Sequence, residues 1–491
     1  MKLPEKFKEY FLSRWNPSTL DSLIQGLDAE PSVSIRLNPA RLPLDALPEG
    51  ADGRVPWCPE GIYLRERPLF TADPLFHAGA YYVQDASSMF LAHVLRHIFQ
   101  PSNPSTFQSF NLSTFQSSNL STFSFADFCR DSTIQASLMA LAAPKVQPSS
   151  VLDLCAAPGG KSTLLRSLLP DDCLLVANEP NRTRVQVLAE NMAKWGHPNV
   201  LVTQAMAADF ADSAAPSGDF DLILADVPCS GEGMFRKEEE AVRQWSPQLV
   251  AECAALQRSI IRDVWPALCP GGTLIYSTCT FNPEEDEDNV KWIAQELGAE
   301  IVPIPVNPTW GIVTDSSDSP PTSVSLPFCH FLPGLIRGEG FFLAVLRKHG
   351  EPENADFIEE RPKNEKRKER RNKKGKHKEE HRTLRERLAA SLTTLSTDQL
   401  DAPDSPRVEL SLNDAIRYLR REALTLPPQT PRGTVTVCFR GQRLGLMNNL
   451  GTRANNLYPR EWRIRSTFVE GHCLFPENSP ILPPIQVNSL E

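Results

Sequence analysis

The sequence has 491 residues, of which 41% are hydrophobic and 43 are proline, and its formal net charge is −9. A chain of this length has ample apolar residues for a core and is too long for one ordinary domain, so two or three domains are expected. Residues 361–382 hold twelve Lys and Arg against four acids, which leaves a net charge of −17 on the rest of the chain. The overall acidity therefore does not exclude a nucleic-acid partner.

Eleven cysteines are spread along the chain without a C-x-x-C pair or a histidine-rich spacing. This pattern argues against structural zinc and against a disulfide framework, so we expect no metal. The first residues, MKLPEKFKEYFLSRW, lack an apolar signal core. No apolar run reaches the length of about 18 residues that a membrane span needs. We therefore predict a cytoplasmic protein with reduced thiols and no membrane partner.

The N-terminal part mixes short helical and extended signals up to residue 80, and YYVQDASSMFLAHVLRHI (81–98) favours a helix entered through Gln84 and Asp85. An eight-residue repeat, STFQSFNL, STFQSSNL and STFSF, follows within residues 105–125. Its period is too short for a solenoid unit, so residues from about 101 to 125 are interpreted as a polar low-complexity insertion.

Strands and helices alternate regularly from residue 151 onward. Strands that alternate with helices form a parallel, doubly wound sheet, so the sequence predicts an α/β core. The expected helices span 162–169, 182–196, 246–268 and 284–297. The expected strands are VLDLC (151–155), CLLVANEP (173–180), NVLVTQ (199–204), FDLILADV (220–227), GTLIYSTC (272–279) and GFFLAVLRK (340–348).

The C-terminal part begins with the basic run, which lacks apolar periodicity, and ends in a smaller unit with strand-like TVTVCFRGQRLGLM. Taken together, the patterns predict four segments. These are an N-terminal α+β extension (1–80), an α/β domain (81–350), a basic linker (351–383) and a small β-rich domain (384–491).

A glycine-rich turn, DLCAAPGGKST (153–163), separates a buried strand from a helix. Gly159 and Gly160 permit a tight turn and a close approach to a ligand whose polar end meets the free N–H groups of the helix. Glu179 lies twenty residues after Gly159, where doubly wound folds place a carboxylate for ribose hydroxyls. The turn fits neither the triphosphate P-loop nor the dinucleotide fingerprint, which leaves a nucleoside cofactor with little phosphate, such as S-adenosylmethionine.

Asp226, Cys229 and Cys279 follow two predicted strands at their carboxyl ends, where doubly wound sheets bind ligands. If these strands are neighbours, both thiols and the carboxylate face one crevice beside the glycine-rich turn. This set suits methylation of carbon 5 of a pyrimidine, because a thiolate added at carbon 6 makes carbon 5 nucleophilic. A carboxyl group at ring nitrogen 3 would stabilise the developing charge, and a second thiol could assist release.

The motifs DLCAAPGGKS, DVPCSGEG and YSTCTFNPEE resemble, in this order, those of the Sun (Fmu) family of RNA cytosine carbon-5 methyltransferases. YYVQDASSM, RKEEEAVRQWS and GEGFF extend the resemblance, which covers roughly residues 30–348. It implies a Rossmann-like core that uses S-adenosylmethionine, with Cys279 as nucleophile, Cys229 as the release-assisting thiol and Asp226 as the base contact. The cofactor-binding residues that we predict are Ala156, Ala157, Pro158, Gly159, Gly160, Lys161, Ser162, Glu179 and Asp226.

Two positions depart from the family pattern. Met206 stands where the family often has an aspartate after the third strand, and Asp209 is the residue that could replace it. Ahead of GEGFF, where the family usually shows an arginine and then Pro-His, this chain has His330 and Pro333-Gly334. Neither departure touches the two thiols.

The segment GLMNNLGTRANNLYPREWRIRS (445–466) resembles the C-terminal PUA-like module of bacterial members that modify small-subunit ribosomal RNA. Its arginines suit phosphate contact and its aromatic residues suit base stacking. Alternatively, the aromatic residues form a small core with the arginines outside. The residues concerned are Arg453, Arg460, Arg463, Arg465, Tyr458 and Trp462.

We therefore predict an enzyme that forms 5-methylcytosine in small-subunit ribosomal RNA, free or in the 30S particle, through a cysteine adduct at carbon 6. The same chemistry on transfer RNA is the nearest alternative. A DNA cytosine methylase would use the Pro-Cys thiol as nucleophile and leave Cys279 without a purpose. A non-catalytic RNA-binding assembly factor would keep the fold without needing both thiols and the glycines. The sequence specifies no oligomeric state.

Overall fold

The computed structural model describes residues 3–99, 147–213, 218–314, 325–350, 383–398, 400, 402, 404–465 and 471–482. The predicted insertion at about 101–125 lies outside these residues, as does the predicted linker 351–383 except for its last residue. Within the described ranges, no helix has both the length and the apolar character that crossing a membrane requires.

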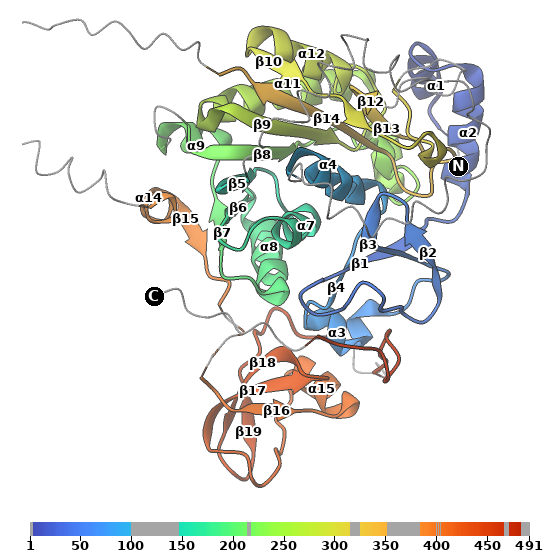
Figure 1. The fold of residues 1–491 in the computed structure, drawn as a ribbon. Helices are drawn as coiled ribbons and strands as arrows, with labels where there is room; N and C mark the ends of the chain where they lie inside the picture. Colours follow the sequence, from blue (N-terminus) through green and yellow to red (C-terminus); the bar gives the residue numbers. More distant parts are fainter. Residues whose placement is uncertain are drawn as a thin grey trace, which may run out of the picture.

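The N-terminal unit is a small antiparallel sheet with two helices packed against the central domain (Figure 1). Its strands lie in the order β2-β3-β1-β4. Strand β4 pairs with β1, so this unit extends past residue 80, where we predicted its end. Its elements are α1 (Glu5–Leu12), α2 (Pro17–Asp28), β1 (Val33–Leu37), β2 (Ala51–Val55), β3 (Cys58–Leu64), η1 (Phe70–Ala72), α3 (Pro74–His77) and β4 (Tyr81–Val83).

The central domain is built on a nine-stranded sheet whose main path is β10-β14-β9-β8-β5-β6-β7-β15, with β13 paired to β14. The inner strands β7, β6, β5, β8 and β9 are parallel, as predicted, whereas β14, β10 and β15 are antiparallel to their neighbours. The strands are β5 (Ser150–Asp153), β6 (Leu174–Asn178), β7 (Val200–Gln204), β8 (Phe220–Asp226), β9 (Leu268–Thr278), β10 (Ala299–Ile301), β13 (Cys329–Phe331), β14 (Phe341–Lys348) and β15 (Thr393–Leu395). A separate pair is formed by β11 (Ile304–Pro305) and β12 (Ser325–Leu326).

Helices cover both faces of this sheet, which explains why its strands read as continuous apolar runs. One apolar cluster lies between the sheet and α4, α7 and α8, and a second lies between the sheet and α9, α11, α12 and α14. The helices are η2 (Ser87–Met89), α4 (Phe90–Phe99), α7 (Gly160–Leu168), α8 (Arg182–Trp195), α9 (Ala207–Ser213), η5 (Glu232–Met234), α10 (Glu239–Gln244), α11 (Pro247–Val264), η6 (Trp265–Ala267), α12 (Glu287–Glu296), η7 (Pro308–Trp310) and α14 (Leu384–Ser391).

Local sequence signals set the helix ends. Asn181 accepts hydrogen bonds from the backbone N–H groups of Thr183 and Arg184, and so caps the start of α8. Ser246 caps α11 in the same way, with Pro247 at the first helical position. The helix predicted to be entered through Gln84 and Asp85 begins as η2 and continues as α4, and the residues before this entry form strand β4, which pairs with β1.

The predicted boundary at residue 384 is wrong, because α14 and β15 belong to the central domain. Strand β15 pairs antiparallel with β7 and so extends the main sheet. Arg387 in α14 forms an ion pair with Asp219 at 2.5 Å, and Arg385 donates to the carbonyl oxygen of Val200 at 2.9 Å. Backbone groups at the edge of β7, together with the carboxylate of Asp219, are the partners that hold this segment.

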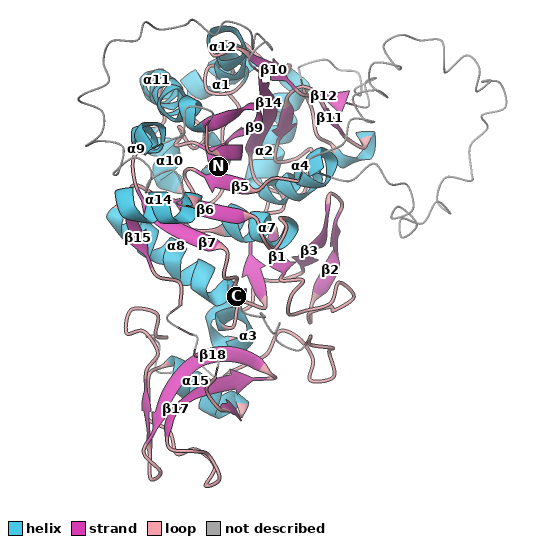
Figure 2. Cartoon of the chain, turned by 60° about the vertical axis from the view of Figure 1, so that its left-hand side comes forward, coloured by secondary structure: helices cyan, strands magenta, loops and turns pink. Residues whose placement is uncertain are grey.

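The C-terminal unit is a four-stranded sheet with one helix, and it lies beside α3 of the N-terminal unit (Figure 2). The two units share one apolar cluster, in which the ring of Tyr81 lies 5.8 Å from that of Phe475. The C-terminal sheet, in the order β16-β17-β18-β19, and its helix comprise β16 (Arg407–Glu409), α15 (Leu412–Leu419), β17 (Gly433–Phe439), β18 (Gln442–Asn449) and β19 (Ala454–Asn456).

Tyr458 belongs to the core of this unit, so the prediction that it stacks on RNA bases is wrong. Its side chain is fully buried, with its ring 5.3 Å from Tyr418 and 6.1 Å from the half-buried Trp462. The alternative interpretation, aromatic residues inside and arginines outside, describes the structure. The exposed arginines are Arg453, Arg460, Arg463 and Arg465.

Leu224 in the middle of β8 gives a direct test of the core. Its side chain is fully buried, so Leu224→Ala should lower the free energy of unfolding by about 2–5 kcal/mol through lost burial and the cavity left behind. The measurement is the first transition in urea denaturation. Leu256→Ala, at a leucine 49% exposed in α11, is the matched control and should change the value by less than about 0.5 kcal/mol. Equal effects would contradict the packing.

Candidate functional site

The two thiols meet at the carboxyl ends of adjacent strands. Strands β8 and β9 are parallel neighbours, and Asp226 at the end of β8 lies opposite Ser277 in β9. The Sγ atoms of Cys229 and Cys279 are 2.9 Å apart, and the backbone N–H of Cys279 donates to Sγ of Cys229 at 3.3 Å. The structure therefore brings together two cysteines that are fifty positions apart in the sequence.

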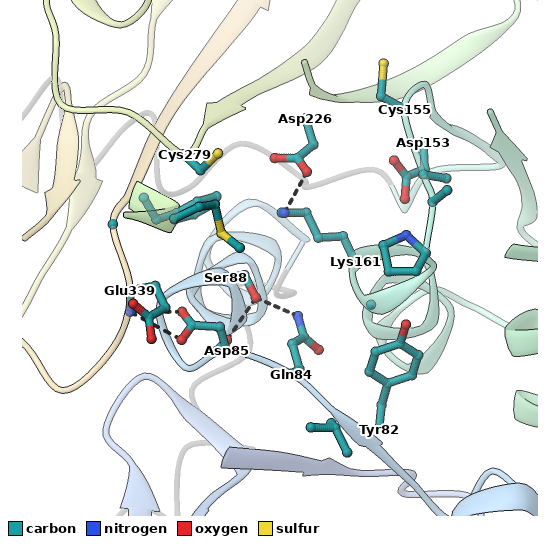
Figure 3. Close-up of a pocket in the computed structure, with 18 of the residues that line it drawn as sticks. Tyr82, Gln84, Asp85, Ser88, Asp153, Cys155, Lys161, Asp226, Cys279 and Glu339 are labelled. Carbon is teal, nitrogen blue, oxygen red and sulfur yellow. Dashed lines mark hydrogen bonds and ion pairs between the residues drawn. The ribbon is translucent and has the colours of Figure 1, made fainter. Parts of the chain in front are cut away.

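A cavity of about 340 Å³ opens beside the thiols (Figure 3). Three parts of the chain form its walls: the ends of β5, β8 and β9, the glycine-rich turn before α7, and segments next to β4 and β14. Its lining residues are Tyr82, Val83, Gln84, Asp85, Ser88, Asp153, Cys155, Ala156, Ala157, Pro158, Gly160, Lys161, Asp226, Met234, Lys237, Cys279, Glu339, Gly340 and Phe341.

Most of the residues predicted from the sequence line this cavity, but four of them, Gly159, Ser162, Glu179 and Cys229, do not. Gly159 adopts a left-handed backbone conformation, φ 114°, at the start of α7, which explains the need for glycine at this turn. Ser162 donates to Asp153 at 2.6 Å and so orients a lining carboxylate. Glu179 is buried, accepts the backbone N–H of Asn181 and pairs with an arginine of α8.

Met206 and Asp209, the two residues considered for the adenine side, also lie outside the cavity lining. The Met206 side chain is 64% exposed. Asp209 accepts the backbone N–H of Met206 at 2.8 Å, and so caps the first turn of α9.

An ion pair lies in the cavity next to the thiols. Nζ of Lys161 is 2.8 Å from Oδ2 of Asp226 (Figure 3). Oδ1 of the same carboxylate accepts the hydroxyl of Ser277 at 2.7 Å. Burial lowers the pKa of Lys161, but the charge of Asp226 outweighs it and the pKa is raised overall. The Lys161 ammonium also lies 5.2 Å from the centre of the Phe341 ring. Lys161 is therefore held charged beside a fixed carboxylate.

The two thiols differ in their surroundings. The pKa of Cys229 is raised well above its usual range, first by the hydrogen bond with Cys279 and then by burial. A thiolate, rather than a thiol, is the form that attacks carbon. Cys229 is therefore suited to remain a thiol and donate a hydrogen bond to the sulfur of Cys279.

Sequence reasoning missed Asp153, the last residue of β5. This carboxylate is fully buried in the cavity wall, and its Oδ1 has no hydrogen-bond partner among the described residues. Burial raises its pKa to about 7. The available signal was its position at a strand end, which is the same signal that identified Asp226.

Residues on the opposite wall of the cavity also received no predicted role from the sequence. Asp85 accepts backbone N–H groups of Ser87 at 2.9 Å and Glu339 at 3.2 Å, and Lys237 lies 3.1 Å from the Glu339 carboxylate. Burial raises the pKa of Asp85. These residues belong to the motifs that carried the family resemblance, although no role was assigned to them individually.

A separate buried group, Asp286, Glu287 and His330, has the side-chain composition of a metal site. The Nε2 atom of His330 is 3.0 Å from Glu287, whose carboxylate is also 2.7 Å from the guanidinium of Arg14. An arginine this close neutralises the carboxylate and opposes a second cation. We therefore assign this group to an internal ion-pair network that anchors the N-terminal helices.

Comparisons with known proteins match all three parts of the chain. Residues 139–347 match the family model of the 16S rRNA methyltransferase RsmB/F, residues 3–86 that of the N-terminal domain of 16S rRNA methyltransferase RsmF, and residues 405–464 that of the methyltransferase RsmF PUA domain. The match over 3–86 agrees with the extension of the N-terminal unit past residue 80, and the match over 405–464 agrees with the start of the C-terminal unit after β15.

Individual relatives agree with these matches. Ribosomal RNA small subunit methyltransferase F of Cronobacter sakazakii is 32% identical over 358 residues, which cover 70% of this chain and 63% of the relative. The protein of the same name from Escherichia coli is 33% identical over 299 residues, 60% of this chain and 51% of the relative. The chain thus spans between about half and two thirds of the length of these curated relatives.

The fold also agrees with a solved structure. The crystal structure of PH0851 superposes with a TM-score of 0.51 at 20% identity, covering 70% of this chain and 66% of that one. Family models for three domains, relatives above 30% identity and a shared fold all agree. The chain therefore belongs to the RsmB/F family of methyltransferases, the Sun (Fmu) family that its motifs resemble.

Proposed function

We propose that this chain is an S-adenosylmethionine-dependent RNA methyltransferase that forms 5-methylcytosine in small-subunit ribosomal RNA. One observation carries the proposal: two thiols, 2.9 Å apart, lie beside an aspartate–lysine pair at the edge of a cavity lined by the glycine-rich turn. The names of the relatives support ribosomal RNA as the substrate.

The cavity has features that suit the methyl donor. The Oδ1 atom of Asp153 is buried without a partner among the described residues, and an ammonium group such as that of the donor's methionine part would satisfy it. An added Cβ at Gly160 in the turn would be 3.3 Å from the ring of Tyr82, so a larger residue there would require a small shift of this cavity wall. S-Adenosylmethionine, when bound, supplies an electrophilic methyl group.

Cys279 and the ion pair perform the first half of the proposed reaction. The thiolate of Cys279 forms a bond from Sγ to carbon 6 of cytosine, and the electrons of the carbon 5–carbon 6 double bond move toward ring nitrogen 3. The Lys161–Asp226 pair faces this edge of the base and holds a proton where the negative charge develops. Carbon 5 thereby becomes nucleophilic and takes the methyl group.

Cys229 acts in the second half. A water molecule takes the proton from carbon 5, the double bond between carbons 5 and 6 re-forms, and the carbon 6–sulfur bond breaks with its electron pair left on the sulfur of Cys279. Cys229, held as a thiol by its raised pKa, donates a hydrogen bond to the departing sulfur across the 2.9 Å gap. Without that donor, the covalent adduct should persist.

The pKa of Asp153 gives a pH prediction for cofactor binding. Below pH 7 this carboxyl is protonated in the free protein, because burial raises its pKa to about 7, so it must release its proton to bind a cation. The Kd for S-adenosylhomocysteine should therefore fall by up to about tenfold per unit as pH rises toward 7, and level off above it. Calorimetric titration across this range is the measurement. Asp153→Asn should bind more weakly and without this pH dependence, and an unchanged slope in the variant would contradict the role.

RNA binding is proposed for the units on both sides of the central domain. The C-terminal PUA-type unit exposes Arg453, Arg460 and Arg463 over its aromatic core, which suits contact with phosphates. Because the cavity must admit a base taken out of its stack, a loop or single-stranded target is favoured. The cytoplasm, where ribosomal RNA is modified, is the proposed location.

The proposal is tested by mapping 5-methylcytosine. Purified protein with S-adenosylmethionine is incubated with small-subunit ribosomal RNA, with 30S particles and with transfer RNA, each from a strain that lacks the enzyme, and bisulfite sequencing locates the product. New 5-methylcytosine in the ribosomal substrates is the expected result. Methylation confined to transfer RNA would replace the proposed substrate, and methylation at another atom would overturn the chemistry.

A further inference from the structure

Two loops contain the thiols, and in each loop a glutamate carboxylate accepts a backbone hydrogen bond from the other loop. The first thiol loop (227–235) follows β8 and contains Cys229, and the second thiol loop (279–286) follows β9 and contains Cys279. Glu232 of the first loop accepts the backbone N–H of Phe281 at 2.7 Å. Glu285 of the second loop accepts the backbone N–H of Ser230 at 3.0 Å.

Each of these bonds falls next to a sulfur. Ser230 directly follows Cys229, and Phe281 lies two positions after Cys279. The backbone N–H of Gly233 adds a third link, because it donates to the carbonyl oxygen of Cys279 at 2.8 Å. These three hydrogen bonds join the backbones of the two thiol loops directly. They are additional to the pairing of β8 with β9.

One side chain joins the two carboxylates. The Nδ2 group of Asn282 donates to Glu232 at 3.1 Å and to Glu285 at 2.8 Å. Trp245 donates to Glu232 at 2.8 Å, and Gln257 donates to Glu285 at 2.8 Å. Every carboxylate oxygen in this group therefore accepts at least one hydrogen bond.

Burying two carboxylates costs free energy, which a contact that serves stability alone does not require. Glu232 is 1% exposed and Glu285 is fully buried, and burial raises the pKa of both groups. Well-packed apolar side chains often stabilise an interior as well as buried charged groups do. What apolar side chains do not supply is directional bonds to particular backbone N–H groups, and such bonds fix the position of one loop against the other.

We infer that Glu232 and Glu285, joined by Asn282, are positioning residues that hold the two thiol loops in register, so that the sulfur of Cys229 stays within hydrogen-bond distance of the sulfur of Cys279. The inference rests on the proposed function for its catalytic consequence. Its geometric content, the approach of Cys229 to Cys279, does not depend on RNA or on a methyl donor. Nothing in the bonding requires either carboxylate to touch the substrate, because both lie behind the thiols among Trp245, Gln257 and Asn282.

The first test measures the thiol pair directly in the full chain without RNA. Dibromobimane links two neighbouring thiols and fluoresces strongly only when both have reacted, with one bromide displaced by each sulfur. Glu232→Gln and Glu285→Gln keep the shape of the side chain but replace one carboxylate oxygen by an NH2 group. That group cannot accept a hydrogen bond from the N–H donors that face it. We expect the rate of double reaction to fall at least tenfold in both variants, and Asp288→Asn, an exposed carboxylate in α12, to match the unsubstituted protein. Cys229→Ser gives the background from the other cysteines.

Rates within twofold of the unsubstituted protein in both glutamine variants would overturn the inference. Melting curves show whether each glutamine variant is folded. If one of them is not folded, Asn282→Ser, which removes only the amide that joins the two carboxylates, is measured in its place. A smaller fall in the serine variant than in the glutamine variants supports the inference, and no fall in any folded variant overturns it.

The second test separates the inference from the proposed function. If the carboxylates position the thiols for methylation, kcat should fall at least tenfold in each glutamine variant while the KM for RNA stays within twofold. A rise in KM at constant kcat would assign the carboxylates to RNA binding and overturn a positioning role. If the unsubstituted protein methylates no RNA but the cross-linking rates fall as expected, the proposed function fails and the geometric inference stands.

Discussion

Cys279→Ala should abolish methylation of small-subunit ribosomal RNA, with a loss of at least about 10³-fold in turnover. The reason is that carbon 5 of cytosine is a poor nucleophile until a sulfur has added at carbon 6. Among the described residues, Cys279 is the thiol that combines a place in the cavity wall with a position beside Asp226 and Lys161. Cys155 also lines the cavity, but burial raises its pKa far above the usual range, which disfavours its thiolate. The measurement is transfer of tritiated methyl groups into the RNA.

Binding should survive this substitution. Because the alanine variant keeps the glycine-rich turn and the surfaces proposed to contact RNA, its Kd for S-adenosylhomocysteine should stay within twofold. Cys253→Ala, at a partly exposed thiol of α11 outside the cavity, is the matched control and should retain full turnover. Turnover in Cys279→Ala above about a tenth of the unsubstituted rate would be incompatible with a nucleophilic role.

Cys229→Ala should have a different consequence, which is accumulation of a covalent protein–RNA adduct. In this variant Cys279 can still attack carbon 6 and carbon 5 can still take the methyl group. The hydrogen bond that Cys229 supplies to the departing sulfur is missing, and the loss of such a donor slows a proton-dependent step by about 10²-fold or more. The adduct should appear as a band that resists denaturant in gel electrophoresis and disappears after ribonuclease treatment.

The double variant provides the control for this experiment. Cys229→Ala combined with Cys279→Ala should give no adduct, because the attacking sulfur is gone. If Cys279→Ala accumulates adduct and Cys229→Ala does not, the two roles are exchanged. If the double variant still methylates RNA, the thiol mechanism as a whole has to be abandoned.

Much of the fold follows from local patterns in the sequence. The runs at 174–177 and 222–225 are continuously apolar because helices cover both sides of the sheet, so they are recognised as buried parallel strands without further information. The ends of α8 are equally local, since Asn181 caps its start and Gly196 adopts the left-handed conformation after its last residue. Such elements are decided by their own residues and near neighbours.

The elements that were misplaced depend on partners far away in the chain. Thr393 and Thr394 are polar and exposed and only Leu395 is partly buried, so it is the pairing with β7 that makes this segment a strand of the central domain. Residues 81–83 were placed in the central domain with the helix that follows them, yet they pair with β1, more than forty residues earlier, as a strand of the N-terminal sheet. Tyr458 reads equally well as a base-stacking residue or as core, and the packing of Tyr418 against it decides between the two.

The site shows the same division. That Cys229 and Cys279 meet could be predicted, because parallel strands bring their carboxyl ends to one edge of the sheet. That Glu232 and Glu285 cross between the loops could not, because a run of acids such as EEDE reads as a solvated helix start. Their burial results from donors on other segments, including Trp245 and Gln257.

The short edge strands of the nine-stranded sheet bear on how this molecule behaves at high concentration. Both ends of the sheet, β10 and β15, are only three residues long. A long open margin would offer a ladder of unpaired amide and carbonyl groups to the margin of a second copy, which is a common route to aggregation. Here, β15 pairs with the otherwise open edge of β7. Because β15 is only three residues long, it exposes few unpaired backbone groups itself. The return of the chain to the edge of β7 thus disfavours edge-to-edge association between copies of this protein.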